Sequence, residues 1–177
     1  LVHLERVFKS DVAKNMFYRP FKNSMIITGG LTALSMLIGC TLAYLVVRTN
    51  LPYKKFIANI AAIPYIIPSW PIALAWLTLF KNQRVGGSMG WVEYITGVAP
   101  PNWISYGAFP IIICLSLHYY AFSFITVSGA LASIDSNLEE TAALLGANKK
   151  QVMTKVTLPL VMPAILSSFI LTFSRTI

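Results

Sequence analysis

The sequence predicts an all-α polytopic membrane protein with four membrane spans in this chain. Hydrophobic residues make up 56% of the 177 residues and charged residues only 11%, whereas charged residues make up about 25% of an average soluble domain. So few charged side chains cannot cover the surface of a soluble domain. Four charge-free apolar stretches have the length of about 20 residues that a helix needs to cross a bilayer. They cover residues 24–47, 56–80, 109–134 and 156–174.

The net charge of +8 would suggest a nucleic-acid partner in a soluble protein. Here the Lys and Arg residues lie between the apolar stretches rather than in one patch, as residues that flank membrane spans do. We therefore expect the lipid bilayer, and not nucleic acid, as a partner. The chain begins with Leu1 and stops at Ile177, just after an apolar stretch. We expect residues 1–177 to be a single transmembrane domain that forms part of a longer protein.

The first span is expected to be a continuous helix. Ser35, Gly39 and Ala43 recur every four residues within it, which places three small side chains on one helix face. Such stripes allow the backbones of two membrane helices to approach closely. We interpret this stripe as a packing surface rather than as a binding site.

The second span is interrupted by Pro64, Pro68 and Pro71. Each Pro lacks a backbone N–H and crowds the preceding helical turn, and a carbonyl that loses its partner in lipid needs protein or water instead. The pattern fits either a kinked packing helix or a broken span that lines a pathway. In the second case Tyr65 and Trp70 are candidates for a translocation path.

The third span contains His118, followed by Tyr119. An ionisable side chain inside a membrane is a functional candidate by default, so both residues are further candidates for the translocation path. The alternative is a structural His that bonds a helix carbonyl or a neighbouring Ser. No metal site is expected, because the chain has only two His and two Cys and a metal needs three or four converging donors.

The segment between the third and fourth spans is charged and is expected to lie outside the hydrocarbon as two short helices. Ser136 and Glu139 have the spacing of a helix-capping box. Gly146 is expected to end this first helix with a positive φ. Asn148 and Gln151 predict the cap of a second helix that runs towards the fourth span.

The first of these short helices carries an apolar stripe of Leu138, Ala142 and Leu145, at spacings of four and three residues. Charged side chains rim the stripe, and nothing else in the chain is expected to cover it. Periodicity alone leaves two interpretations open, which are a protein partner and a helix that lies in the lipid interface.

The same segment resembles the EAA loop, the signature of the membrane subunits of bacterial ABC importers. The family pattern is Glu-Ala-Ala, three residues, Gly, nine residues and Ile-x-Leu-Pro. Thr141 stands in place of the first Ala and Val156 in place of Ile, and both replacements are small. Both gaps are preserved, and the matching positions are Glu140, Ala142, Gly146, Val156, Leu158 and Pro159.

The resemblance covers about residues 22–175. Within these permeases, the chain is similar to the iron(III), spermidine/putrescine and phosphonate branch through the stretches RTNLP, IPYIIPSW and ALASIDSNLEETAALLGA. It implies the type I ABC importer core as the fold. It also implies that residues 135–155 lie in the cytoplasm and dock as a coupling helix on an ATPase subunit. Loop 48–55 is then inside and loop 81–105 outside. The expected coupling residues are Glu139, Glu140, Ala142, Leu145, Gly146, Val156, Leu158 and Pro159.

The implied function is that of a permease subunit in the cell membrane, which forms the solute path of an ATP-driven importer. The implied partners are two copies of an ABC ATPase subunit, a second permease copy or half, and an extracytoplasmic solute-binding protein. No phosphate-binding loop or catalytic motif is present. We therefore expect no catalytic residue and no cofactor in this chain, with ATP and Mg²⁺ on the ATPase.

The alternative function is an ion-driven secondary transporter or channel. Such proteins favour carboxylates or arginines inside the membrane. All six acidic residues of this chain lie outside the four spans, which counts against this alternative.

Overall fold

The computed structural model describes residues 13–177, and every regular element of this part of the chain is a helix. The expected all-α fold is therefore confirmed. In chain order the elements are η1 (Lys14–Tyr18), α3 (Arg19–Arg48), α4 (Lys54–Ile66), α5 (Ser69–Phe80), α6 (Gln83–Gly86), α7 (Trp91–Thr96), α8 (Asn102–Ser105), α9 (Ala108–Ser133), α10 (Ser136–Leu144), α11 (Lys149–Val152), η2 (Met153–Thr157) and α12 (Leu158–Thr176).

Three helical stretches of the described chain are long and apolar enough to cross a membrane, namely Lys14–Arg48, Asn102–Ser133 and Lys149–Thr176. They contain the first, third and fourth expected spans almost completely. The first of these helices already includes Lys14, ten residues before residue 24, because the polar residues before the apolar stretch continue the helix. A charge-free stretch therefore locates the apolar part of a span but not the ends of its helix.

The second expected span is broken rather than kinked. Helices α4 and α5 are bent by 95° at Ile67 and Pro68, whose ψ angles are 130° and 153°. Pro68 has no N–H and disfavours the helical conformation of the residue before it, so α4 cannot continue into α5. Pro64 is accommodated inside α4. The bent pair provides a fourth span only if its two halves cross the membrane as one unit.

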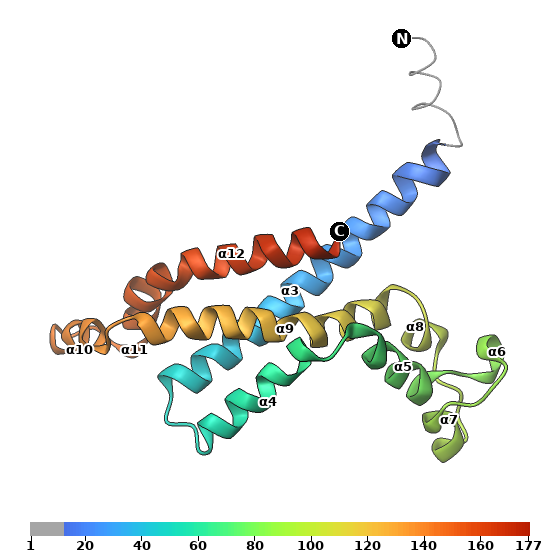
Figure 1. The fold of residues 1–177 in the computed structure, drawn as a ribbon, viewed down its shortest axis with the longest axis horizontal. Helices are drawn as coiled ribbons and strands as arrows, with labels where there is room; N and C mark the ends of the chain where they lie inside the picture. The colour runs from blue at the N-terminus through green and yellow to red at the C-terminus, as the bar shows by residue number, and fades with distance from the viewer. Residues whose placement is uncertain (1–12) are drawn as a thin grey trace, which may run out of the picture.

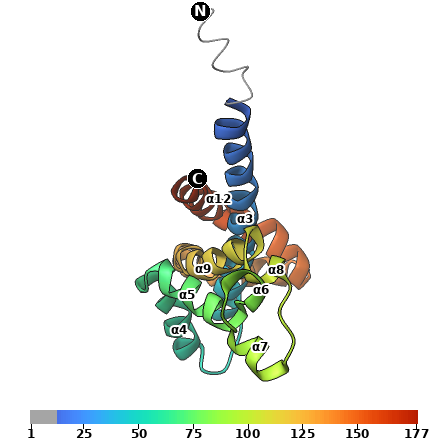
Figure 2. The same ribbon diagram turned by 90° about the vertical axis from the view of Figure 1, so that its right-hand side faces the viewer.

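Helix α9 is central to the arrangement. In both ribbon views it lies between α12 and the α4–α5 pair, and α3 crosses it (Figure 1 and Figure 2). Helices α6, α7 and α8 gather at one end of the molecule, and α10 and α11 lie at the other end (Figure 1). The charged segment and the loop 81–105 are thus separated by the length of the long helices.

Helices α3 and α9 approach each other closely at Gly39. A Cβ atom at this position would lie 2.7 Å from the Ser123 Cβ and from the Tyr120 carbonyl oxygen, and 2.9 Å from the Phe124 nitrogen. All three members of the predicted small-residue stripe are buried. The prediction that this stripe packs two helix backbones together is therefore confirmed.

Hydroxyl groups also link the three long helices inside the bundle. The Ser168 hydroxyl donates to the Ser123 Oγ at 3.1 Å, and Ser123 donates to the Met36 Sδ at 3.2 Å. Near the end of α12, the Thr28 hydroxyl donates to the Thr176 carbonyl oxygen at 3.1 Å. Interhelical hydrogen bonds of this kind contribute about 0.6 kcal/mol each in membrane proteins. They tie α12 and α3 to each other and to α9.

Replacing Gly39 by Ala is expected to destabilise the bundle, because backbone atoms of α9 occupy the space that the new Cβ needs. Overpacking costs about 1–3 kcal/mol, and thermal unfolding of the purified protein in detergent measures the loss. Gly29→Ala is the matched control, since it lies in the same helix, nothing lies within 4 Å of its Cβ position, and Ala favours a helix over Gly. Equal melting temperatures for the two variants would contradict the close packing.

Candidate functional site

The segment that joins α9 to α12 begins with a short extended link. Ile134 and Asp135 have ψ angles of 127° and 123°, so the chain leaves α9 before α10 begins. The Asp135 side chain caps α10 by accepting a hydrogen bond from the Asn137 N–H at 3.0 Å. The predicted capping box of Ser136 and Glu139 is wrong, because Asp135 occupies the cap position and the Glu139 carboxylate bonds elsewhere.

Gly146 ends the first short helix with a positive φ, as predicted. Its φ is +90°, and the N–H groups of Gly146 and Ala147 donate to the carbonyl oxygens of Ala143 and Ala142, each at 3.0 Å. This pair of bonds is a Schellman motif, which requires a left-handed residue at the helix end. Nothing lies within 4 Å of a Cβ at Gly146. The backbone conformation, and not crowding, therefore requires Gly here.

The second short helix has the predicted capping box. The Asn148 and Gln151 side chains each accept a hydrogen bond from the N–H of the other residue, at 2.9 and 2.8 Å. Helix α11 then continues through the π-helical turn η2 into α12 as one helical stretch. Pro159 is the second residue of α12, directly after the π-helical turn η2. Val156 and Leu158 are half-buried and Pro159 is exposed.

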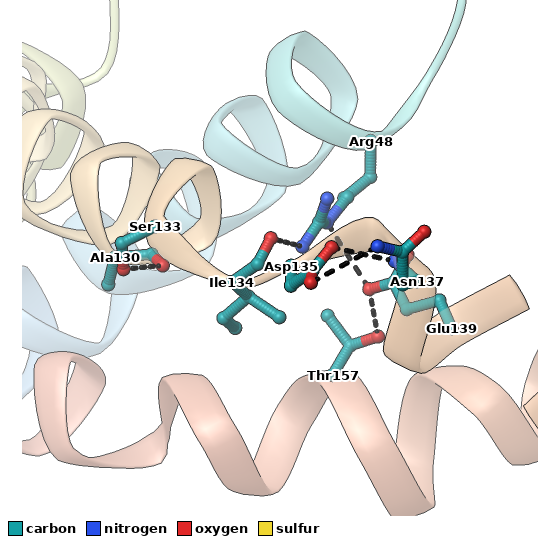
Figure 3. Close-up of polar contacts among 8 residues, drawn as sticks. All are labelled: Arg48, Ala130, Ser133, Ile134, Asp135, Asn137, Glu139 and Thr157. Carbon is teal, nitrogen blue, oxygen red and sulfur yellow. Dashed lines mark hydrogen bonds and ion pairs between the residues drawn. The ribbon is translucent and has the colours of Figure 1, made fainter. Parts of the chain in front are cut away.

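The Glu139 carboxylate is the centre of a polar cluster (Figure 3). The Arg48 Nε lies 3.2 Å from the Glu139 Oε1 as an ion pair, and the Thr157 hydroxyl donates to the same oxygen at 2.6 Å. The Arg48 Nη2 also donates to the Ile134 carbonyl oxygen at 3.2 Å, which places a cation at the C-terminal end of α9, where the helix dipole favours it. Four segments of the chain meet at this cluster.

Neither the capping patterns nor the specified positions of the EAA pattern include Arg48 or Thr157, the two partners of Glu139. Neither residue belongs to a motif with Glu139, and only the tertiary fold brings the three together. One signal for Arg48 is its position directly after an apolar stretch, because a charged side chain close to hydrocarbon needs a partner.

Glu140, which matches the Glu of the EAA pattern, is exposed and has no ion-pair partner within residues 13–177. It lines a cleft of about 520 Å³ between the end of α3 and the α10–α11 segment, together with Arg48 and Lys149. The two adjacent carboxylates therefore have different surroundings. Glu139 is bonded within the chain, and Glu140 is accessible from outside it.

Three leucines of the α10 segment are exposed. The exposed fractions are 51% for Leu138, 88% for Leu144 and 85% for Leu145. The exposed face differs from the predicted stripe at Ala142, which is half-buried, and at Leu144, which the stripe does not include. Leu144 is the last residue of α10. Adjacent exposed leucines rimmed by charge are typical of a surface that a partner covers.

Among the residues that the structure describes, the four candidates for a translocation path do not share one cavity or cluster, and their contacts are different. Tyr65 stacks on Phe122 with ring centroids 6.1 Å apart, and the His118 and Tyr119 rings meet edge to face at 5.0 Å. The His118 Nδ1 is buried and has no hydrogen-bond partner in the described part of the chain. Trp70 lines an apolar cavity of about 320 Å³ between α5 and α9. Across residues 13–177, no three His, Cys, Asp or Glu side chains are grouped closely enough to hold a metal ion.

Known proteins with similar sequences are components of transport systems. Residues 35–177 match the family model described as the binding-protein-dependent transport system inner membrane component. The chain is 30% identical over 161 residues to the ferric transport system permease protein FbpB of Actinobacillus pleuropneumoniae, covering 90% of this chain and 23% of that protein. It is 23% identical over 156 residues to the molybdate/tungstate transport system permease protein WtpB of Thermococcus kodakarensis, covering 88% and 55%.

The fold also matches solved structures of a bacterial ABC transporter that imports the acidic polysaccharide alginate. The TM-score is 0.73 at 23% identity, over 97% of this chain and 59% of that chain. In a complex with an alginate pentasaccharide-bound periplasmic protein, the score is 0.70 over 96% and 58%. The predicted ABC importer fold is therefore confirmed.

The chain spans between 23% and 61% of the length of the curated relatives described by these comparisons. Its long apolar helices identify it as a multi-pass membrane protein, and the family model covers most of its length. The chain belongs to the family of binding-protein-dependent transport system inner membrane components.

Proposed function

We propose that this chain is the membrane-spanning part of a permease subunit in an ATP-driven ABC importer, and that residues 135–155 lie in the cytoplasm and dock on the ATPase. The observation that carries the proposal is the exposed leucine face of the α10 segment, formed by Leu138, Leu144 and Leu145 at one end of the helix bundle. A helix that presents apolar anchors outside its own fold suits a hydrophobic groove of a partner. Membership of a family of transport-system components supports the same function.

The proposed coupling residues have different tasks. Leu145 enters the groove of the ATPase, Glu140 faces that subunit from the cleft, and Gly146 sets the direction of the turn. Glu139 holds the segment to the rest of the chain. The remaining four residues fix the segment on the bundle. Ala142, Val156 and Leu158 are half-buried, and Pro159 lies at the start of α12.

The proposed partners follow from this assignment. Two copies of the ATPase subunit bind ATP and Mg²⁺, a second permease copy or half completes the solute path, and a solute-binding protein delivers solute from outside. The position of loop 81–105 at the end opposite α10 supports an external location for that loop. The alginate transporter has a structure in complex with its periplasmic protein, which supports a partner of that kind here.

We propose that the transported solute is iron(III), a polyamine or a phosphonate. Along its path we place four residues, namely Tyr65, Trp70, His118 and Tyr119. The relative named for ferric transport supports iron(III), whereas the relative named for molybdate and tungstate supports an oxyanion. The four path residues include no charged pair that would select between these classes. Selection is therefore assigned mainly to the solute-binding protein.

Uptake into vesicles tests the proposed function. The full-length permease is reconstituted with its ATPase and its solute-binding protein, and labelled solute is followed with and without ATP on the ATPase side. We expect uptake to require ATP and to persist after ionophores collapse the ion gradients. Uptake that proceeds without ATP and stops with the ionophores would instead establish an ion-driven secondary transporter.

A further inference from the structure

Two non-helical joints separate α10 from the long helices on either side of it. The first joint is the extended link of Ile134 and Asp135, and the second is the Gly146 turn between α10 and α11. Rotation about either joint would let α10 move without moving the bundle. A partner that pulls on α10 could then displace it without effect on the solute path.

Arg48 crosses the first joint. Its Nη2 bonds the Ile134 carbonyl oxygen, at the point where the chain leaves α9 and the joint begins, and its Nε pairs with the Glu139 carboxylate after the joint (Figure 3). Arg48 is the last residue of α3, so this one side chain connects the ends of α3 and α9 to the first turn of α10. The side chains of Arg48 and Glu139 are only 13% and 22% exposed, and charge pairs that are shielded from water are stronger than exposed ones.

Thr157 crosses the second joint. Its hydroxyl donates to the same Glu139 oxygen that faces Arg48, at 2.6 Å, and Thr157 is only 3% exposed. It lies at the end of η2, directly before α12. Hydrogen bonds to an ionised acceptor are short and about twice as strong as neutral ones. One carboxylate therefore holds α10 against both neighbouring parts of the chain.

We propose that Arg48 and Thr157 are positioning residues that act through Glu139 and make α10 move as one body with the ends of α3, α9 and α12. A displacement of α10 by the ATPase then reaches the long helices instead of being lost at the two joints. This inference rests on the proposed importer function. It assigns the transmission step to Arg48, which lies outside the EAA pattern, and to Thr157, which occupies the unspecified position of its Ile-x-Leu-Pro part.

The first measurement is hydrogen exchange of the purified full-length permease, which does not depend on transport. Thr157→Val removes the hydroxyl and keeps a similar side-chain volume, and Glu139→Gln removes the charge. We expect faster exchange of the amides in residues 134–148 in both variants, with unchanged exchange in α9. Thr154→Val is the matched control, because Thr154 lies in the same π-helical turn, is exposed and bonds only the Lys150 carbonyl oxygen of its own helix.

The second measurement is the amount of solute transported per ATP hydrolysed in reconstituted vesicles. We expect this ratio to fall about fivefold or more in Thr157→Val and Glu139→Gln, as for the loss of an ordinary coupling between two sites, while ATP hydrolysis continues. Thr157→Ser keeps the hydroxyl and should therefore have a ratio close to that of the wild type. A role in folding alone would instead lower transport and hydrolysis together and leave the ratio unchanged.

The outcomes separate the two proposals. An unchanged ratio and unchanged exchange in Thr157→Val and Glu139→Gln would overturn the positioning role while the wild type still shows ATP-driven uptake. Wild-type uptake that needs no ATP would overturn the importer function and, with it, the transmission step. In that case, the hydrogen exchange would still decide whether Glu139 holds α10 to the bundle.

Discussion

Leu145→Asp is expected to detach the ATPase from the permease. Leu145 is 85% exposed, so the substitution removes almost no contact within the chain and should leave membrane insertion intact. In the docked complex the side chain would be buried in the partner's groove, where a Leu contributes about 1.5–3 kcal/mol. An unpaired carboxylate there adds a further desolvation cost. Since about 1.4 kcal/mol corresponds to a tenfold change in affinity, the ATPase should bind at least tenfold more weakly.

Co-purification of the ATPase with the full-length permease measures this effect, together with ATP-dependent uptake in vesicles. Ser136→Asp is the matched control, because it introduces the same charge at an exposed position in the first turn of α10, the helix that ends directly before Leu145, and the helix dipole favours an acid there. Retention of the ATPase by Leu145→Asp at the level of this control would refute docking through the leucine face.

Gly146→Val is expected to abolish transport while the protein still inserts into the membrane. The φ of +90° at Gly146 lies in a region that costs an L-residue about 1–2 kcal/mol and that β-branched side chains rarely adopt. Because no atom lies within 4 Å of the Cβ position, the strain is confined to the turn. The two hydrogen bonds of Gly146 and Ala147 should break, and α10 should lose its direction relative to α11.

Gly146→Asn is the comparison variant, because Asn enters the left-handed region more readily than other residues with a side chain. It should keep most of the uptake that Val loses, and both variants should be present in the membrane in equal amounts. Normal uptake by Gly146→Val would show that the turn does not serve coupling. A loss of membrane protein in parallel with uptake would assign Gly146 to folding alone.

The membrane helices could be predicted from the sequence because their cause is local. A run of about 20 apolar residues without charge predicts a span, and the expected 109–134 nearly coincides with Ala108–Ser133. The caps of α11 and the Gly146 turn also depend on residues within a few positions of one another. The bend of 95° between α4 and α5 is different, because three prolines predict a break but not the direction in which the chain continues.

The Glu139 cluster could not be predicted, for a physical reason. A carboxylate in the first turn of a helix usually bonds the helix's own N-terminal N–H groups, and the spacing from Ser136 favours that arrangement. Asp135 satisfies the cap first, which leaves Glu139 free to pair with Arg48 and Thr157. That competition depends on where the ends of α3 and η2 lie, and no local pattern records it.

Thr157 directly precedes α12 and Thr176 is its last residue, so the two hydrogen-bonded threonines lie at opposite ends of this helix. At 1.5 Å per residue, the 19 residues of α12 extend over roughly 28 Å. If α12 rotates by about 10° relative to α3 about its Thr157 end, its far end moves by about 5 Å over that length. The hydrogen bond of 3.1 Å from Thr28 to Thr176 cannot stretch so far. Its rupture would therefore be an early marker of any such rotation.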